Sequence, residues 1–304
     1  MNGQLWHSLR HEVSGKPPLE FPIKLRQLTH IDQISASHWD ALLPNGYPFL
    51  RHGFLAALER SGSVSMQAGW APAHLVVENP DGTLQALLPL YQKMHSYGEY
   101  VFDWQWAEAW ERAGQHYYPK LLAAVPFSPV QGPRLLGRCE TSQQLILQAL
   151  NETLQRGSVS GVNLLFNDDQ GNHLLEQAGW MQRLGCQFHW FNREYQSFDG
   201  FLAACSSRKR KNFRKERQSV EAQGIHFEWH QGVEINEAHW ERFFPFYAAT
   251  YLKRGQQPYL TRAFFSELSA ELPDVARLVF ARHDGKDVAG ALFLVGDDTL
   301  YGRY

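Results

Sequence analysis

Apolar and polar residues alternate in short runs along the chain, and the period of the pattern switches repeatedly between two and about 3.6 residues. The clearest unit is "AHLVVENPDGTLQALLPL" (73–90), where two β-rich runs flank an Asn-Pro-Asp-Gly turn and predict a β-hairpin. Before it, "FPIKLRQL" (21–28) predicts a strand, and Ser35 is a candidate N-cap for a short helix carrying Trp39. The helical spacing of "LRHGFLAALERSG" predicts a helix that stops at Gly62.

The middle of the chain continues this alternation of strand and helix patterns. "GEYVFD" (98–103) predicts a third strand, and "WQWAEAWERAG" (104–114) predicts a helix directly after it. "YPKLLAAVPF" (118–127) fits either period, but prolines bound it at both ends and favour a strand. Four further elements follow: a helix over 142–155, a strand in "GVNLLFND" (161–168), a helix in "GNHLLEQAGW" (171–180) and a strand in "CQFHWFN" (186–192).

A second round of elements begins near Tyr195. Two helices, over 198–205 and over the basic stretch that follows, precede a strand in "IHFEWH" (225–230). Helical patterns then cover 237–251 and 262–272, and three strands with a turn at Asp284-Gly285 complete the chain. The second round repeats the helix, helix, hairpin, strand opening of the first.

This order of elements predicts an α/β fold in which helices cover the faces of a mixed sheet. We divide the chain into a loose leader (1–20), a first domain (21–194) and a second domain (195–304). Because the chain ends inside a predicted strand, we expect the second domain to be incomplete, with an exposed sheet edge.

The charge of the chain is concentrated in one place. Its net charge is −2, yet the ten residues 208–217 hold seven cations and one acid. Without them the chain would carry 22 basic and 30 acidic residues. A basic run on an acidic protein argues against general coating of nucleic acid, so we expect no DNA partner.

Composition excludes several other classes. Three cysteines without metal-ligand spacing indicate reduced thiols and a cytoplasmic protein, and the first residues lack the apolar core of a signal peptide. No run of 18 apolar residues predicts a membrane span. The chain has no Gly-x-Ser-x-Gly, His-Glu-x-x-His or Cys-x-x-Cys motif, so we expect no metal and no tightly bound cofactor. The oligomeric state is left open.

The basic stretch is the first candidate binding site. If Phe213 faces the core, a step of 100° per residue aligns Arg210, Arg214 and Arg217 on one flank of the helix and puts Lys211 on its outer side. Stacked guanidinium groups suit a phosphate or carboxylate, which predicts a small anionic substrate.

Two other interpretations of the basic stretch stay open. The helix can be a solvated one whose charge is offset by acids such as Glu59 or Glu216. Its outer lysine face can also contact a nucleic acid, namely a transfer RNA.

"HSYGEYVFDWQW" (95–106) is the first candidate catalytic segment. In an extended chain His95, Glu99 and Asp103 share one face, where aromatic neighbours would desolvate a carboxylate and raise its pKa toward that of a general base. The alternative is that Asp103 is simply the N-cap of the helix that begins at Trp104.

Further candidates lie in residues 117–120 and in two loops, 128–137 and 250–261. Tyr118 can protonate a leaving group, and Tyr117 and Lys120 can bind substrate, although paired tyrosines also pack as core residues. Prolines in "SPVQGPRLLG" remove amides that a phosphate-binding loop needs, so that loop is expected to present Arg134 to an acceptor.

The last candidate is the loop within "TYLKRGQQPYLT" (250–261). It offers Arg254 and Tyr259 between two predicted helices, and loops of this kind often line sites. A solvent-exposed connector is the alternative.

Three phrases of the sequence resemble a known family. They are residues 95–136, "SSRKRKNFRKERQSV" (206–220) and the closing "YGRY", and they resemble the bacterial FemAB-like group of predicted N-acyltransferases, of the GNAT-type superfamily, associated with peptidoglycan biosynthesis or recognition. The resemblance implies two tandem acyltransferase-like folds with substrate at or between them. It implies direct transfer of an acyl or aminoacyl group, from acyl-CoA or aminoacyl-tRNA, to an amine of an anionic acceptor such as a peptidoglycan precursor. The alternative is a non-catalytic module that binds such a precursor.

Overall fold

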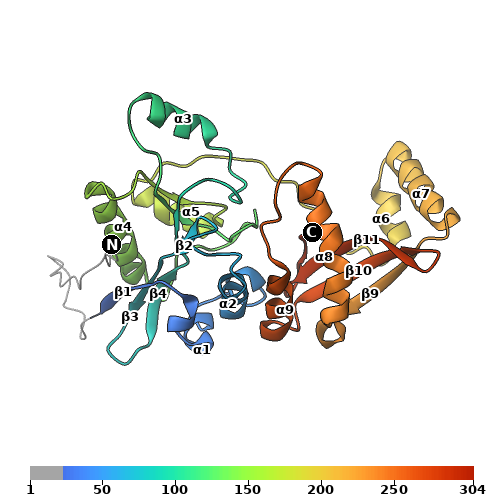
Figure 1. Ribbon diagram of the computed structural model, residues 1–304, viewed down its shortest axis with the longest axis horizontal. Helices are drawn as coiled ribbons and strands as arrows, with labels where there is room; N and C mark the ends of the chain where they lie inside the picture. The colour runs from blue at the N-terminus through green and yellow to red at the C-terminus, as the bar shows by residue number, and fades with distance from the viewer. Residues whose placement is uncertain (1–22) are drawn as a thin grey trace.

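The computed structural model describes residues 23–304, which form a mixed α/β fold with three four-stranded sheets (Figure 1). The predicted leader, residues 1–20, lies outside the described residues. The first sheet is antiparallel throughout and packs against α4 (Glu140–Gln155). Its strands, in spatial order, are β1 (Lys24–Leu28), β3 (His74–Glu78), β4 (Leu84–Leu88) and β7 (Leu136–Gly137).

The second sheet is the mixed one, because β6 and β8 run parallel while its other pairs are antiparallel. In spatial order it consists of β2 (Trp70–Pro72), β5 (Tyr91–Lys93), β6 (Lys120–Ala123) and β8 (Val162–Leu164). The remaining helices of this part of the chain are α1 (Ala36–Asp40), α2 (His52–Arg60), α3 (Trp104–Arg112) and α5 (Asp169–Gln177), with 3-10 turns η1 (Ile31–Gln33) and η2 (Pro48–Leu50).

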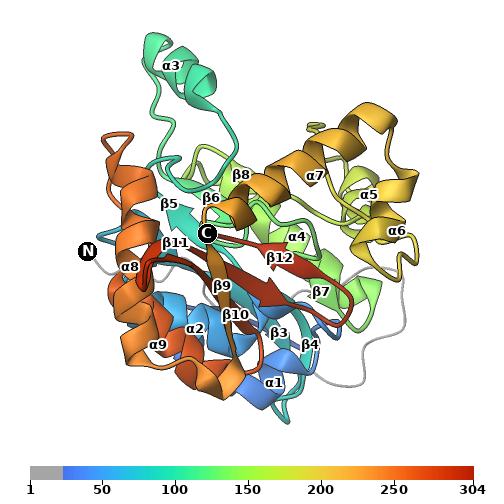
Figure 2. The same cartoon turned by 90° about the vertical axis from the view of Figure 1, so that its right-hand side faces the viewer.

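The third sheet comes from the C-terminal part of the chain and is antiparallel (Figure 2). Its strands, in spatial order, are β12 (Leu300–Gly302), β11 (Lys286–Val295), β10 (Ala276–His283) and β9 (His226–Gln231). The helices of this part are α6 (Phe198–Ala204), α7 (Ser207–Ala222), α8 (Glu237–Leu252) and α9 (Arg262–Glu271), with the 3-10 turn η3 (Gly232–Glu234).

One hydrophobic core joins the N-terminal and C-terminal parts. Helices α2 and α9 lie side by side at the centre of the molecule, where Phe54 meets Phe264 with 5.9 Å between ring centroids (Figure 1). The terminal "YGRY" belongs to the same core, since Tyr301 lies 4.9 Å from Phe49. Backbones also approach closely: a Cβ added to Gly296 would meet the carbonyl oxygen of Gly46 at 2.1 Å. The two parts therefore stabilise each other through shared burial.

Most predicted elements are present. The hairpin of β3 and β4, the helix N-capped by Ser35, the stop of α2 at Gly62 and the strand within 118–127 are all confirmed. The structure differs in that the strands of the first predicted domain form two sheets instead of one mixed sheet. None of the helices in residues 23–304 has the length and apolar character needed to cross a membrane.

Two predicted strands are wrong. Residues 98–103 form a turning loop, because Gly98 and Tyr100 have positive φ angles of 80° and 60° and the acidic side chains of the segment turn inward. Residues 186–192 have an alternating pattern but pair with no strand in the described chain. There Phe188 is 97% exposed, and Trp190 packs on Phe201 of α6 with 6.0 Å between ring centroids.

We expect Phe264→Ala to lower the free energy of unfolding by about 3–5 kcal/mol, because Phe264 is only 2% exposed and fills the junction between α2 and α9. Urea denaturation followed by circular dichroism should show one transition shifted to lower urea. Phe102→Ala, at a side chain that is 77% exposed, is the control with little effect. A variant that splits into two transitions, with the N-terminal part unaffected, would contradict a shared core.

Candidate functional site

Two lysines face each other inside the second sheet. Lys93 in β5 pairs directly with Lys120 in β6, and their side chains are 0% and 1% exposed. Like charges at opposed positions repel, and burial adds to the cost of charging either one. This pair requires carboxylates nearby.

The loop after β5 supplies those carboxylates. The Lys120 ammonium donates to Glu99 Oε2 at 2.8 Å, to Asp103 Oδ2 at 2.5 Å and to Ser96 Oγ at 2.8 Å. Glu99 and Asp103 are 3% and 6% exposed. The left-handed turn at Gly98 and Tyr100 is what brings both acids back over β6.

Two tyrosines that directly precede β6 also contact these side chains. Tyr117 donates to Asp103 Oδ2 at 2.8 Å, and the hydroxyls of Tyr118 and Ser96 share a hydrogen bond of 2.8 Å. We call this set the charge cluster: Lys93, Ser96, Glu99, Asp103, Tyr117, Tyr118 and Lys120. Five of its members are sequence candidates, and the structure brings all five together.

The pKa values of the two carboxyl groups are shifted in opposite directions, although each group has one buried oxygen without a hydrogen-bond partner among the described residues. Burial raises the pKa of Glu99 despite the opposing charge of Lys120, and its Oε1 has no hydrogen-bond partner among the described residues. Burial alone would also raise the pKa of Asp103, but hydrogen bonds from Lys120, Ser96 and Tyr117 outweigh it, and the pKa is lowered. The predicted rise for Asp103 is therefore wrong. Asp103 occupies the N-cap position of α3, yet its side chain makes no capping bond.

Lys93 is a cluster residue that the sequence reasoning missed. Its Nζ lies 3.6 Å from the centroid of the Trp70 ring, 4.0 Å from Glu99 Oε1 and 3.3 Å from the carbonyl oxygen of Tyr97, to which it donates. Burial lowers the pKa of Lys93 to about 7, although the charge of Glu99 acts in the opposite direction. The available signal was a lysine two residues after Tyr91, on the inward side of a buried strand.

An aromatic cavity of about 430 Å³ lies beside the cluster, between the two parts of the chain. Trp70, Tyr97 and Phe127 line it from the N-terminal part, and residues 255–259 line it from the loop between α8 and α9. Tyr259 stacks on Phe127 with 5.1 Å between centroids and an interplanar angle of 10°. The prediction placed Arg254 with Tyr259 in a site; Tyr259 lines the cavity, whereas Arg254 is an exposed neighbour.

His95 lines this cavity and does not join the carboxylates. The turn at Gly98 separates it from Glu99 and Asp103, so the predicted common face is wrong. Its Nδ1 accepts a hydrogen bond from the Tyr97 amide at 3.2 Å, which puts the proton of the neutral ring on Nε2. Burial and the charge of Lys93 lower the pKa of His95. A neutral ring of this tautomer donates from Nε2 and is poorly suited to act there as a base.

Arg134 is a structural residue. Its side chain is fully buried and donates to the carbonyl oxygens of Leu165 at 2.9 Å and Pro133 at 2.8 Å, and to the hydroxyl of Tyr47 at 3.3 Å. The expectation that the loop presents it to an acceptor is wrong, because the loop folds around the guanidinium and uses it to satisfy carbonyl groups.

The arginine flank of α7 packs onto α6. Arg210 donates to the Cys205 carbonyl oxygen at 3.0 Å, Arg214 lies 3.5 Å from Asp199, and Arg217 lies 4.2 Å from the Phe198 ring centroid. Three different partners engage the three guanidinium groups, so the predicted fork array is not formed. No residue of α7 is fully buried, and its Lys211 is exposed.

The flank also lies apart from the charge cluster. Helices α3 and α7 occupy separate regions in both views (Figures 1 and 2). Glu59, a predicted neutralising acid, instead hydrogen-bonds His74 at 2.9 Å and the amide of Ile31 at 2.8 Å.

Comparison with known proteins identifies the family. A model of the FemAB-like family, described as peptidoglycan biosynthesis/recognition, matches residues 30–304. The chain belongs to the FemAB-like family. The predicted resemblance is thereby confirmed.

No curated protein matches the FemAB-like chain. Seven chains of solved structures match it. L-PGS from Bacillus licheniformis is 13% identical with a TM-score of 0.45, over 86% of this chain and 67% of that chain.

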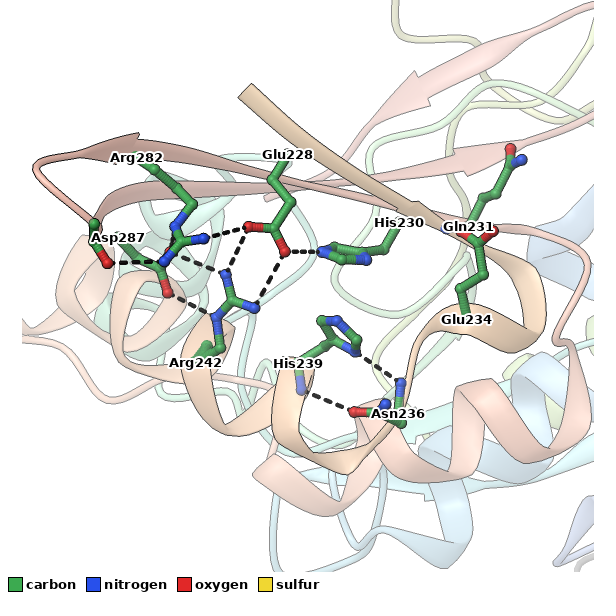
Figure 3. A network of polar contacts seen from close by, with 10 residues as sticks. Glu228, His230, Gln231, Glu234, Asn236, His239, Arg242, Arg282 and Asp287 are labelled. Carbon is green, nitrogen blue, oxygen red and sulfur yellow. Dashed lines mark hydrogen bonds and ion pairs between the residues drawn. The ribbon is translucent and has the colours of Figure 1, made fainter. Parts of the chain in front are cut away.

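A second polar network of the FemAB-like chain ties β9 to α8 (Figure 3). Glu228, His230 and His239 place ligand atoms within 4.8 Å of one another, an arrangement that could suit a metal ion. However, Arg242 and Arg282 both contact the Glu228 carboxylate, at 3.4 Å and 3.1 Å.

The tautomer of His239 also disfavours a metal in this network. Its Nδ1 accepts the Asn236 amide at 3.2 Å, so the neutral ring carries its proton on Nε2 (Figure 3). Asp287 pairs with Arg242 at 2.7 Å and completes the charge balance. The ion pairs of this network therefore hold the edge strand β9 against α8.

We expect Lys120→Met to lower the free energy of unfolding by about 3–5 kcal/mol, because it leaves Glu99 and Asp103 as buried, uncompensated acids. The triple variant Lys120→Met/Glu99→Gln/Asp103→Asn should recover part of that loss. Chemical denaturation measures both. Arg112→Met, at an exposed ion pair of α3, is the control. A single variant as stable as the wild type would contradict the compensation.

We expect the pH dependence of stability to report Lys93. Its folded-state pKa of about 7 lies below the ordinary value of 10.5, so between these pH values the unfolded chain binds more protons. Wild-type stability relative to Lys93→Met should therefore rise as the pH increases from 7 to 10. Denaturation curves across that range measure the difference. A difference that stays flat or falls would show that Lys93 remains charged in the folded protein.

Proposed function

We propose that the chain is an N-acyltransferase of two tandem GNAT-like units, 21–194 and 195–304, that transfers an acyl or aminoacyl group to an amine. The acceptor is a cell-wall precursor, and the donor is acyl-CoA or aminoacyl-tRNA. Family membership supports the process, and the charge cluster beside a cavity between the two parts supports the chemistry.

One observation carries the proposal: a continuous hydrogen-bonded chain from a half-buried tyrosine to a buried acid. It runs from Tyr118 to Ser96 at 2.8 Å, to Lys120 at 2.8 Å and to Glu99 at 2.8 Å. Such a chain can move a proton between a substrate at Tyr118 and the interior without exposing the acid to water.

Acyl transfer needs that proton movement. The amine nitrogen forms a bond to the acyl carbon, the bond from that carbon to the leaving sulfur or oxygen breaks, and one proton passes from the amine to the leaving group. Tyr118 would donate its proton to the leaving group and be reprotonated by Ser96, which Lys120 supplies. Lys120 in turn would regain the proton that Asp103 takes from the amine. Asp103, whose pKa is lowered, stays ionised and would accept the proton of the amine. Transfer is direct, without an acyl-enzyme.

The exposed side of α7 would contact the donor if that donor is a transfer RNA. Arg208, Lys211 and Lys215 lie on the outer side and are exposed, and among the described residues they form no ion pair with α6, unlike Arg214. Cations arranged along one helix face suit the phosphates of a nucleic acid backbone and would make donor use sensitive to salt.

We expect Tyr118→Phe to lower the rate of transfer about 10²–10⁴-fold, because it removes the outer hydroxyl of the relay. Acetyl-CoA and aminoacyl-tRNA would each be incubated with a nucleotide-linked muropeptide, and the product measured by mass spectrometry. Tyr195→Phe, a half-buried tyrosine outside the cluster, is the matched control.

The outcome also separates the two candidate functions. Precursor binding with no transfer from either donor would favour the non-catalytic binding module. If Tyr118→Phe transfers the acyl group as fast as the wild type, the hydrogen-bonded chain from Tyr118 to Glu99 has no role in the reaction.

A further inference from the structure

The turn of residues 98–100 places Glu99 on the Lys120 ammonium, where Oε2 of Glu99 accepts a hydrogen bond of 2.8 Å. Both neighbours of Glu99 have left-handed backbones, with φ angles of 80° at Gly98 and 60° at Tyr100. A residue with a side chain rarely adopts this conformation unless its surroundings impose it. The position of Glu99 therefore depends on the contacts that hold its two neighbours.

The C-terminal part holds the first neighbour, Gly98. A Cβ added to Gly98 would meet the Phe127 ring at 2.6 Å, so this ring lies directly against the turn. Tyr259, from the loop between α8 and α9, stacks on the same ring with 5.1 Å between centroids. The Tyr259 hydroxyl also interacts with the Gly98 backbone. Tyr259 thus contacts the turn directly through its hydroxyl and indirectly through Phe127.

The C-terminal part also holds the second neighbour, Tyr100. The hydroxyl of Tyr100 interacts with that of Tyr251, near the end of α8. Tyr251 in turn contacts Tyr259 with 5.3 Å between ring centroids and Tyr247 with 5.2 Å. Because Tyr247 is only 2% exposed, these rings are anchored in the shared core. We call Tyr251 and Tyr259 the tyrosine pair.

The tyrosine pair acts on the charge cluster only through the turn, since no hydrogen bond or ion pair within residues 23–304 joins it to Glu99 or Lys120. We propose that Tyr251 and Tyr259 are positioning residues, which hold both neighbours of Glu99 and thereby fix this acid against Lys120. The inference deepens the proposed function on which it rests, because it makes the relay depend on the C-terminal part.

The loop between the two tyrosines makes this arrangement adjustable. Residues 252–257 are exposed, and a Cβ added to Gly255 would meet no atom within 4 Å. The loop is tied down at its far end, where the Leu260 amide donates to the Tyr247 hydroxyl at 2.9 Å and the Thr261 amide to Ser63 Oγ at 3.0 Å. Because residues 255–259 also line the aromatic cavity, a ligand that displaces the loop would move Tyr259 and, through Gly98, the acid.

Hydrogen exchange of the full chain, followed by mass spectrometry without donor or acceptor, tests the inference. Tyr251→Phe/Tyr259→Phe removes both hydroxyls and keeps both rings. We expect amides of residues 97–103 to exchange at least about tenfold faster in this variant, and those of β10 and β11 to exchange as in the wild type. Tyr301→Phe is the matched control, because Tyr301 also joins the two parts but contacts Tyr47 and Phe49.

A pH profile separates positioning from the mere loss of a contact. The titratable groups that act on the Lys93 ammonium are His95, Glu99, Asp103 and Lys120. Burial is the largest influence on Lys93, so water admitted by a loosened turn would raise its pKa from about 7 toward 10.5. Between pH 7 and 10, the stability gained relative to the matching Lys93→Met variant should therefore shrink in Tyr251→Phe/Tyr259→Phe, by about threefold or more in the unfolding constant.

In the Tyr301→Phe control, both the exchange of residues 97–103 and the pH profile should match the wild type. Unchanged exchange in residues 97–103 of the double variant, or an unchanged pH profile, would overturn the positioning role. Faster exchange throughout the chain would overturn it as well, because the tyrosines would then support the fold in general. No acyl donor is used, so these results are independent of whether the chain transfers an acyl group.

Discussion

The structure depends on how two buried ammonium groups are accommodated on neighbouring strands. Lys93 and Lys120 oppose each other in the second sheet, and neither reaches solvent. Aqueous hydration lost at such positions must be replaced from within the protein. Here the replacement is the loop that carries Glu99 and Asp103, together with the face of Trp70. The conformation of that loop, the start of α3 and the wall of the aromatic cavity all follow from it.

The same constraint gives the cluster its chemical asymmetry. Each carboxyl has one buried oxygen without a hydrogen-bond partner among the described residues, but hydrogen bonds to the other oxygen lower the pKa of Asp103, whereas burial raises the pKa of Glu99. One lysine is fully engaged by acids, whereas the other has a pKa near neutrality. The two carboxyl groups around the Lys120 ammonium thus have pKa values shifted in opposite directions, an arrangement that sites of proton transfer use.

Local patterns predicted the elements well where local interactions decide them. The Asn-Pro-Asp-Gly hairpin, the Ser35 cap and the stop at Gly62 depend on neighbours in sequence. The tyrosines and the lysine at 117–120 were predicted to lie near the acids, because one segment follows the other closely. Residues 98–103 were predicted wrongly because tertiary ion pairs, and not their β-rich composition, set the backbone.

Long-range partners account for the other errors. The contacts of Arg134 with Leu165 and Tyr47 span 31 and 87 positions, and the partners of the α7 arginines depend on how α6 docks. Lys93 was overlooked because a lysine within a strand is ordinarily placed at the surface. Periodicity indicates which side of a strand faces inward, but it does not reveal which charges an interior can neutralise.

The carbonyl of Tyr97 accepts hydrogen bonds from both the Lys93 ammonium and the Trp70 indole, and the Trp70 ring lies between the cavity lining and Lys93 Nζ, 3.6 Å from its centroid. A guest that expels water beside Trp70 makes protonation of Lys93 more costly. Occupancy would then release a proton, and by thermodynamic reciprocity alkaline conditions would favour occupancy. Binding in a cavity without charged lining residues can therefore still change the pKa of a buried amine.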